Sequence, residues 1–283
     1  MMTDIQKRHK REISRISLGQ AASDGAGVKL TRLIGSPEIN MIDPFLLLDN
    51  FESDNPGDYI GGFPSHPHRG FETVTYLLAG RMRHKDNAGH EGVIEPGGVQ
   101  WMTAGRGIIH SEMPEQENGL LQGFQLWVNL SAKDKMIAPA YQEFSPDEIP
   151  VEIQEKAAVR VISGATDQGS LGAVINILTR PLFLDVSLKA GSSFTQAIPE
   201  SHNGFIYVIA GGLQTGGDLL TARQLGILGE GDHVALTAGP EESRFLLIAG
   251  QPLDEPVARG GPFVMTTKAE VQQAFQDYHN GKF

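Results

Sequence analysis

Residues 61–80 read GGFPSHPHRGFETVTYLLAG and residues 97–114 read GGVQWMTAGRGIIHSEMP, and these two stretches decide the fold. Both combine β-branched, aromatic and aliphatic residues with glycine and proline, as short strands joined by tight turns do. Similar runs recur along the chain at intervals of about 8–12 residues, the spacing of sandwiches and barrels. The pattern predicts an all-β protein.

Two pairs of metal-binding residue types lie within these stretches. His66 and His68 flank Pro67, and His110 and Glu112 flank Ser111. Alternate residues of an extended strand point to the same face, so each pair can direct two side chains into one space. Three imidazoles and one carboxylate suit a divalent first-row metal, and four protein ligands leave positions for water or substrate. We therefore expect a metal site inside a β-barrel.

The composition of the chain argues against several other classes of protein. The chain has 283 residues, 40% of them hydrophobic, a formal net charge of −11 and no cysteine. The negative charge argues against nucleic acid as a partner, and the lack of cysteine excludes disulfides and thiolate ligands. The N-terminal 14 residues have no apolar core of a secretory signal, and no apolar run approaches the roughly 20 residues of a membrane span. We expect a cytoplasmic protein without a membrane partner.

An internal repeat indicates two barrels. Tyr207-Val-Ile-Ala-Gly211 repeats Tyr76-Leu-Leu-Ala-Gly80, and Gly226-Ile-Leu-Gly-Glu-Gly231 repeats Gly92-Val-Ile-Glu-Pro-Gly97. The segment 131–150 between the two halves is polar and contains three prolines, as a linker would. The repeat predicts an N-terminal barrel over residues 1–135 and a C-terminal barrel over residues 136–283.

The metal-ligand pairs do not repeat with the strands. By the offsets of the two repeated blocks, the four donors correspond to Ala197, Pro199, Arg244 and Leu246. None of these side chains can replace the donor to which it corresponds. The repeat therefore predicts one metal per chain, held by the N-terminal barrel.

The end of the chain predicts a helix. Thr267 and Glu270 have the spacing of a capping box. An apolar stripe follows at helical spacing, made of Val271, Ala274, Phe275 and Tyr278. We expect this helix to pack against the C-terminal barrel and to carry no chemistry.

The other histidines lack a partner pair in the sequence. His84 and His90 flank a predicted hairpin turn, where exposed side chains are expected. His202 and His233 are expected to be solvated or hydrogen-bonded. Trp101 and Trp127 are expected to pack in the barrel wall.

The motifs already quoted, together with FQLWVNL at residues 124–130 and the tail GGPFVMTTKAEVQQAFQDYHNGKF, resemble the pirin family, a bicupin group of the cupin superfamily. The resemblance implies a jelly-roll bicupin fold, with His66, His68, His110 and Glu112 as the metal ligands. The sequence departs from the general cupin pattern, in which the position of Trp101 would be the last histidine ligand. Glu72, the acidic residue after the histidine pair, is not a ligand in the pirin pattern.

The resemblance also implies a function. Pirin-like proteins are associated with quercetin 2,3-dioxygenase activity and, in eukaryotes, with iron-dependent transcriptional co-regulation. We therefore expect a dioxygenase that cleaves quercetin or a related flavonol-like enol with O2, in which Glu112 accepts the substrate hydroxyl proton. Fe(II) is favoured, while Mn, Ni, Co, Cu and Zn remain open because imidazole and carboxylate suit them all. The alternatives are an iron-dependent regulator that acts through a protein partner and a barrel that the metal merely stabilises.

Overall fold

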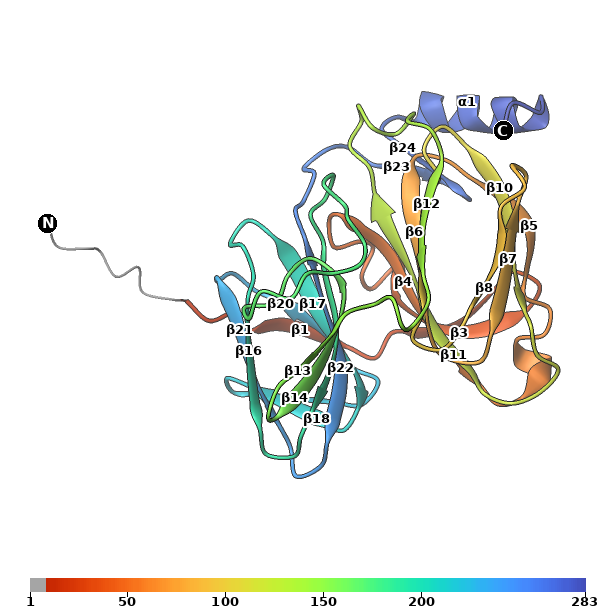
Figure 1. Cartoon of the computed structure of the whole chain (residues 1–283). Coiled ribbons are helices and arrows are strands. Elements are labelled where there is room, and N and C mark those ends of the chain that lie inside the picture. Colours follow the sequence, from red (N-terminus) through yellow and green to blue (C-terminus); the bar gives the residue numbers. More distant parts are fainter. Residues whose placement is uncertain (1–8) are drawn as a thin grey trace, which may run out of the picture. The chain divides into compact units, whose positions relative to one another are not determined.

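The computed structural model describes residues 9–283, which are almost entirely strands and turns (Figure 1). Residues 1–8, which hold most of the charged N-terminal stretch, lie outside the described part. The described residues contain one α-helix, α1 (Lys268–His279), and none that is long and apolar enough to cross a membrane. The predicted all-β class is confirmed.

The first compact unit, called here the histidine barrel, consists of Gly19–Ile149 and Leu253–Phe283. Its seven-stranded sheet has the order β12-β9-β6-β11-β4-β3-β2. The bounds are β2 Gln20–Asp24, β3 Val28–Ile34, β4 Phe45–Ser53, β6 Phe71–Ala79, β9 Val99–Thr103, β11 Leu121–Asn129 and β12 Ala140–Phe144. A four-stranded sheet has the order β5-β10-β7-β8, with β5 Phe63–His68, β7 Met82–Asp86, β8 Glu91–Ile94 and β10 Ile108–Pro114. A hairpin of β23 (Ala258–Gly260) and β24 (Phe263–Met265) leads into α1, and a 3₁₀ turn, η1, spans Pro56–Asp58.

The second unit, called here the apolar barrel, consists of Pro150–Pro252 and the described residues 9–18. Its seven-stranded sheet has the order β1-β20-β17-β22-β15-β14-β13. The bounds are β1 Ile13–Ser17, β13 Val151–Ile153, β14 Ala157–Ser163, β15 Leu182–Leu188, β17 Asn203–Ala210, β20 Leu225–Leu228 and β22 Ser243–Gly250. A four-stranded sheet has the order β16-β21-β18-β19, with β16 Ser193–Ala197, β18 Gly212–Thr215, β19 Asp218–Thr221 and β21 His233–Ala238.

The two strand orders correspond position by position, so the predicted pair of related barrels is confirmed. Tyr76 on β6 and Tyr207 on β17 occupy equivalent strands, as the first repeated block predicts. The predicted equivalence of the two copies of the second repeated block is wrong. Residues 92–97 lead from β8 into β9, whereas residues 226–231 lead from β20 into β21. The strand equivalent to that of His110 and Glu112 is therefore β21, not the β22 strand of Arg244 and Leu246.

The units also differ from the predicted boundary between residues 135 and 136. Strand β12, beyond that boundary, pairs with β9 and completes the large sheet of the histidine barrel. Strand β1, before it, pairs with β20 and completes the large sheet of the apolar barrel. The predicted capping box forms, but α1 and the preceding hairpin belong to the histidine barrel. Ladder hydrogen bonds decide to which barrel an edge strand belongs, and an edge strand can come from a distant part of the sequence.

The interior of the apolar barrel is filled by side chains from both of its sheets. Phe194, Val208, Leu236 and Phe245 belong to one cluster of buried apolar residues there. Alternate positions of β21 are buried, as expected for a strand with one face on a core.

Candidate metal centre

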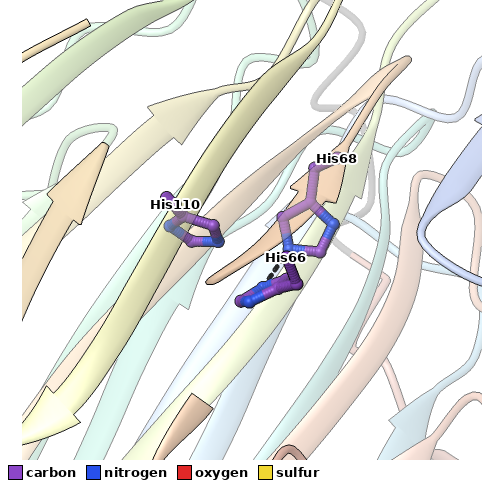
Figure 2. A group of neighbouring side chains, drawn as sticks. All are labelled: His66, His68 and His110. Atoms are coloured by element: carbon purple, nitrogen blue, oxygen red, sulfur yellow. Dashed lines mark hydrogen bonds between the residues drawn. The ribbon is translucent and has the colours of Figure 1, made fainter. Parts of the chain in front are cut away.

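Three histidines converge in the histidine barrel. His66 and His68 lie on β5, and His110 on β10 stands directly opposite His66 in the antiparallel ladder. The Nε2 atoms of His66 and His68 are 2.9 Å apart, and one ring nitrogen from each of the three residues lies within 4.8 Å of the others. Figure 2 shows the three imidazoles grouped between the two strands. The sequence spacing therefore predicted their convergence correctly.

The tautomer of His66 is set by its own strand. Its Nδ1 lies 2.8 Å from the carbonyl oxygen of Pro64 and donates to it. The proton is then on Nδ1, and the lone pair of Nε2 faces the other two imidazoles. A backbone carbonyl that orients a histidine in this way is a common second partner of metal-binding imidazoles.

Burial keeps the other two imidazoles neutral. Side-chain burial, with His110 and His66 nearby, lowers the pKa of His68 well below its usual value. Burial, with His66 and His84 nearby, lowers the pKa of His110 to about 3. Desolvation disfavours the charged form of a histidine, and the neutral imidazole is the form that binds a metal.

The geometry of the three imidazoles fits a first-row divalent ion. Two nitrogens 2.9 Å apart that subtend a right angle at an ion lie 2.9/√2, or about 2.1 Å, from it, and metal–imidazole bonds are about 2.0–2.1 Å long. Both ring nitrogens of His110 are buried without a hydrogen-bond partner among the described residues. A buried nitrogen without a partner is costly, and a metal bond would satisfy one of the two.

The fourth predicted donor, Glu112, lies close by but outside this group of nitrogens. It is buried on β10, and the pairing between β10 and β5 shifts register between His110 and Glu112. Its Oε1 accepts a hydrogen bond of 2.6 Å from Thr75 Oγ1. A register shift of this kind re-aims side chains. The roles of Glu112 as ligand and base remain predictions.

Aromatic rings border the site on the side of His68. The His68 ring lies edge-on to Phe71 and to Trp127, with centroid separations of 5.1 and 5.3 Å. Trp127 therefore packs beside a candidate ligand, while Trp101 is buried on the same strand as Gln100. Glu72 accepts a hydrogen bond from Thr103 and alternates with Thr73 and Phe71, so it points away from the side of β6 that carries Thr75.

The expectation for His84 is wrong. His84 is only 3% exposed, and its Nε2 lies 2.6 Å from Glu143 Oε2, which also accepts from Gln100 Nε2 at 3.0 Å. A Cβ at Gly92 would lie 2.5 Å from His84 Nε2 and 2.7 Å from Glu143 Oε1, so a larger residue there would displace the pair. The alternation of Met82, His84 and Asp86 on β7, all buried, was the signal for this inward orientation. His90 has a largely exposed side chain, as expected, and contacts Asp86.

The two barrels, with one group of convergent histidines among the described residues, place the chain in the class of bicupins with a candidate metal site. The Pirin profile matches residues 27–128, and the profile of the Pirin C-terminal cupin domain matches residues 183–283. The chain belongs to the pirin family.

Relatives span nearly the whole chain. A pirin-like protein of Caulobacter vibrioides is 53% identical over 96% of this chain and 99% of its own length. A Pseudomonas aeruginosa protein, provisionally named quercetin 2,3-dioxygenase, is 47% identical over 96% of this chain and 97% of its own length.

Solved structures show the same fold. The crystal structure of quercetin 2,3-dioxygenase from Acinetobacter baumannii is 34% identical, with a TM-score of 0.89, and covers 97% of this chain and 99% of its own. A bacterial pirin from Escherichia coli, crystallised in complex with nickel(II), is 19% identical, with a TM-score of 0.66 over 83% of this chain and 95% of its own.

Proposed function

We propose that this pirin is a metal-dependent dioxygenase that cleaves quercetin or a related flavonol-like enol with O2. The observation that carries the proposal is the convergence of three imidazoles, His66, His68 and His110, on one point beside a buried carboxylate. The names of the Pseudomonas and Acinetobacter relatives support the substrate class. Fe(II) is the favoured ion, and Mn, Ni, Co, Cu and Zn are alternatives for this donor set.

Each residue of the candidate site has a separate role in this proposal. His66, His68 and His110 would hold the metal, with Glu112 as a fourth ligand. When bound, the metal would supply Lewis acidity toward the enol oxygen and a means of engaging O2. Glu112 would accept the substrate hydroxyl proton, because a carboxylate near the bound oxygen is a suitable general base. The rings of Phe71 and Trp127 would keep bulk water from the His68 side of the site.

The test is oxygen uptake by the metal-loaded protein. The chain would be purified without metal, loaded anaerobically with Fe(II), Mn(II), Ni(II), Co(II) or Cu(II), and mixed with quercetin in an oxygen electrode. We expect uptake that is absent in His110→Ala. If no loaded form consumes O2 with quercetin, the dioxygenase proposal fails, and the regulator that acts through a protein partner becomes the leading hypothesis.

A further inference from the structure

Glu112 is held by a hydrogen bond that crosses the interior of the histidine barrel. Thr75 lies on β6 of the large sheet, Glu112 lies on β10 of the small sheet, and both are buried. The 2.6 Å bond from Thr75 Oγ1 to Glu112 Oε1 therefore connects the two sheets. A hydrogen bond to an ionised carboxylate away from water is among the stronger ones in a protein.

The Thr75 hydroxyl faces a second acceptor, Gln125. Gln125 stands opposite Thr75 in the β11–β6 ladder, and its amide oxygen Oε1 lies 2.8 Å from Thr75 Oγ1, where it can accept a hydrogen bond. Thr75 has a single hydroxyl proton, so it cannot donate to both neighbours. The charged Glu112 oxygen is the stronger acceptor. The contact to Glu112 is also the shorter of the two, 2.6 Å against 2.8 Å, so the Thr75 proton is directed to Glu112.

The bond to Thr75 has a consequence for the metal site. Glu112 makes this bond from a position outside the group of three ring nitrogens. We propose that Thr75 competes with the metal for the Glu112 carboxylate. Glu112 then alternates between a metal-bound position and a position bonded to Thr75, from which it accepts the substrate proton. The base step rests on the proposed dioxygenase, whereas the competition rests on the proposed role of Glu112 as a metal ligand together with the observed bond to Thr75.

The two possible roles of Thr75 predict opposite changes in metal affinity when its hydroxyl is removed. If Thr75 competes for Glu112, removal of its hydroxyl strengthens metal binding. If Thr75 instead orients Glu112 toward the metal, the same removal weakens it. Thr75→Val deletes the hydroxyl and keeps the β-branched shape that suits a strand. We expect tightening of roughly tenfold to a hundredfold, the equilibrium equivalent of one hydrogen bond to a charged group.

The experiment measures the Ni(II) dissociation constant of the full chain by competition with a chromophoric chelator. Thr75→Val should bind more tightly than the wild type, and Thr75→Ser, which keeps a hydroxyl, should match the wild type. The matched control is Thr73→Val, a buried threonine on the same face of β6 with no such contact to Glu112. An unchanged or weaker affinity in Thr75→Val, or an equal gain in Thr73→Val, overturns the proposal.

A double-mutant cycle assigns the effect to Glu112. In the Glu112→Gln background the carboxylate for which Thr75 would compete is gone, so Thr75→Val should change the affinity little. Persistence of the full gain in that background overturns the competition. If Thr75→Val does not fold, Thr75→Ala, which also deletes the hydroxyl, should give the same tightening, and no change there counts against the proposal.

Oxygen uptake separates this inference from the proposed function. Affinities that follow the expected pattern in a protein that consumes no O2 with quercetin would support the competition and overturn the dioxygenase. Quercetin turnover together with an unchanged Thr75→Val affinity would do the reverse.

Discussion

The two barrels share one strand order, but the interior of one is apolar and the interior of the other contains polar side chains. In the apolar barrel, side chains such as Val208, Leu236 and Phe245 fill the space between the sheets. In the histidine barrel, the bond between the buried Thr75 and Glu112 crosses the space between the sheets, and the contact of His84 with the more exposed Glu143 also joins the two sheets. Some of its buried apolar residues form smaller clusters, such as that of Val28, Leu77 and Ile94. The topology therefore positions side chains, and the residue types at inward positions decide whether a barrel is a packed core or a site.

The largest expected effect would come from removing a central imidazole. His110→Ala should lose metal binding, because the ion would lose one of three convergent nitrogens, while the fold persists on its separate apolar clusters. Elemental analysis of the purified variant, compared with the one metal per chain predicted for the wild type, would measure this. Full metal occupancy in the variant would show that His110 is not a ligand.

A smaller loss is expected from the carboxylate beside the imidazoles. Glu112→Gln keeps an oxygen that can coordinate weakly but removes the base, so turnover of quercetin should fall by about 10²–10⁴-fold. Steady-state oxygen uptake, normalised to bound metal, would measure this. Wild-type turnover with metal bound would exclude Glu112 as the base.

The apolar barrel should respond in stability and not in metal binding. Phe245 is fully buried in its core, and Phe245→Ala should lower the free energy of unfolding by about 3–5 kcal/mol. Chemical denaturation would measure the loss, and chelator competition should show an unchanged metal affinity. Leu219→Ala, at a residue 59% exposed in the same barrel, is the control and should change stability by less than about 0.5 kcal/mol. Loss of metal in Phe245→Ala would contradict the division of roles between the barrels.

The smallest expected effect concerns pH and the metal-free protein. His110 has a pKa of about 3 when folded, whereas an unfolded histidine has one of about 6.5, so between these values only the unfolded chain takes up the proton. The contribution of His110 to the free energy of unfolding is therefore fully present above about pH 6.5 and is lost as the pH falls below it. Between pH 7.5 and 5.5, proton uptake by this histidine in the unfolded chain should lower the free energy of unfolding by about 1.4 kcal/mol.

The matched measurement subtracts the other titrating groups. Urea denaturation at pH 7.5 and 5.5 should show a decrease in the free energy of unfolding that is smaller by about 1.4 kcal/mol in metal-free His110→Ala than in the metal-free wild type. His68, with its lowered pKa, should contribute in the same direction in both proteins. Equal decreases would mean that the buried His110 takes up its proton in the folded state.

The sequence reveals that His66 and His68 share one face because the rule that governs it, strand parity, is local. Their convergence with His110 depends on the long-range pairing of β5 with β10, which the ligand pattern of the pirin resemblance implied. The register shift that separates Glu112 from the three nitrogens depends on the partner strand, so parity cannot reveal it. Nor does the hairpin around residue 87 reveal that His84 would meet Glu143, because that contact joins strands of two different sheets.

The barrel boundaries illustrate the same limit. The linker at residues 131–150 looks like a division between halves, yet it contains β12, which pairs with β9. Nothing in the local pattern of residues 13–17 shows that their partner is β20, more than two hundred residues later. Edge strands are assigned by long-range pairing, and composition does not record it.

Each barrel includes a segment from the distant end of the chain, so the two barrels are completed in a defined order during synthesis on the ribosome. The apolar barrel has all its strands once residue 252 has been added, although β1 must wait for β20 before it can pair. The histidine barrel receives its last hairpin and α1 only afterwards, so its ligand strands emerge early and are completed late. Contacts between segments so distant in sequence are slow to form, because a long loop must close before any of them is made. Because Arg69, next to His68, pairs with Phe263 and with Asp277 of that tail, the surroundings of His68 are completed only after the last segment has been added.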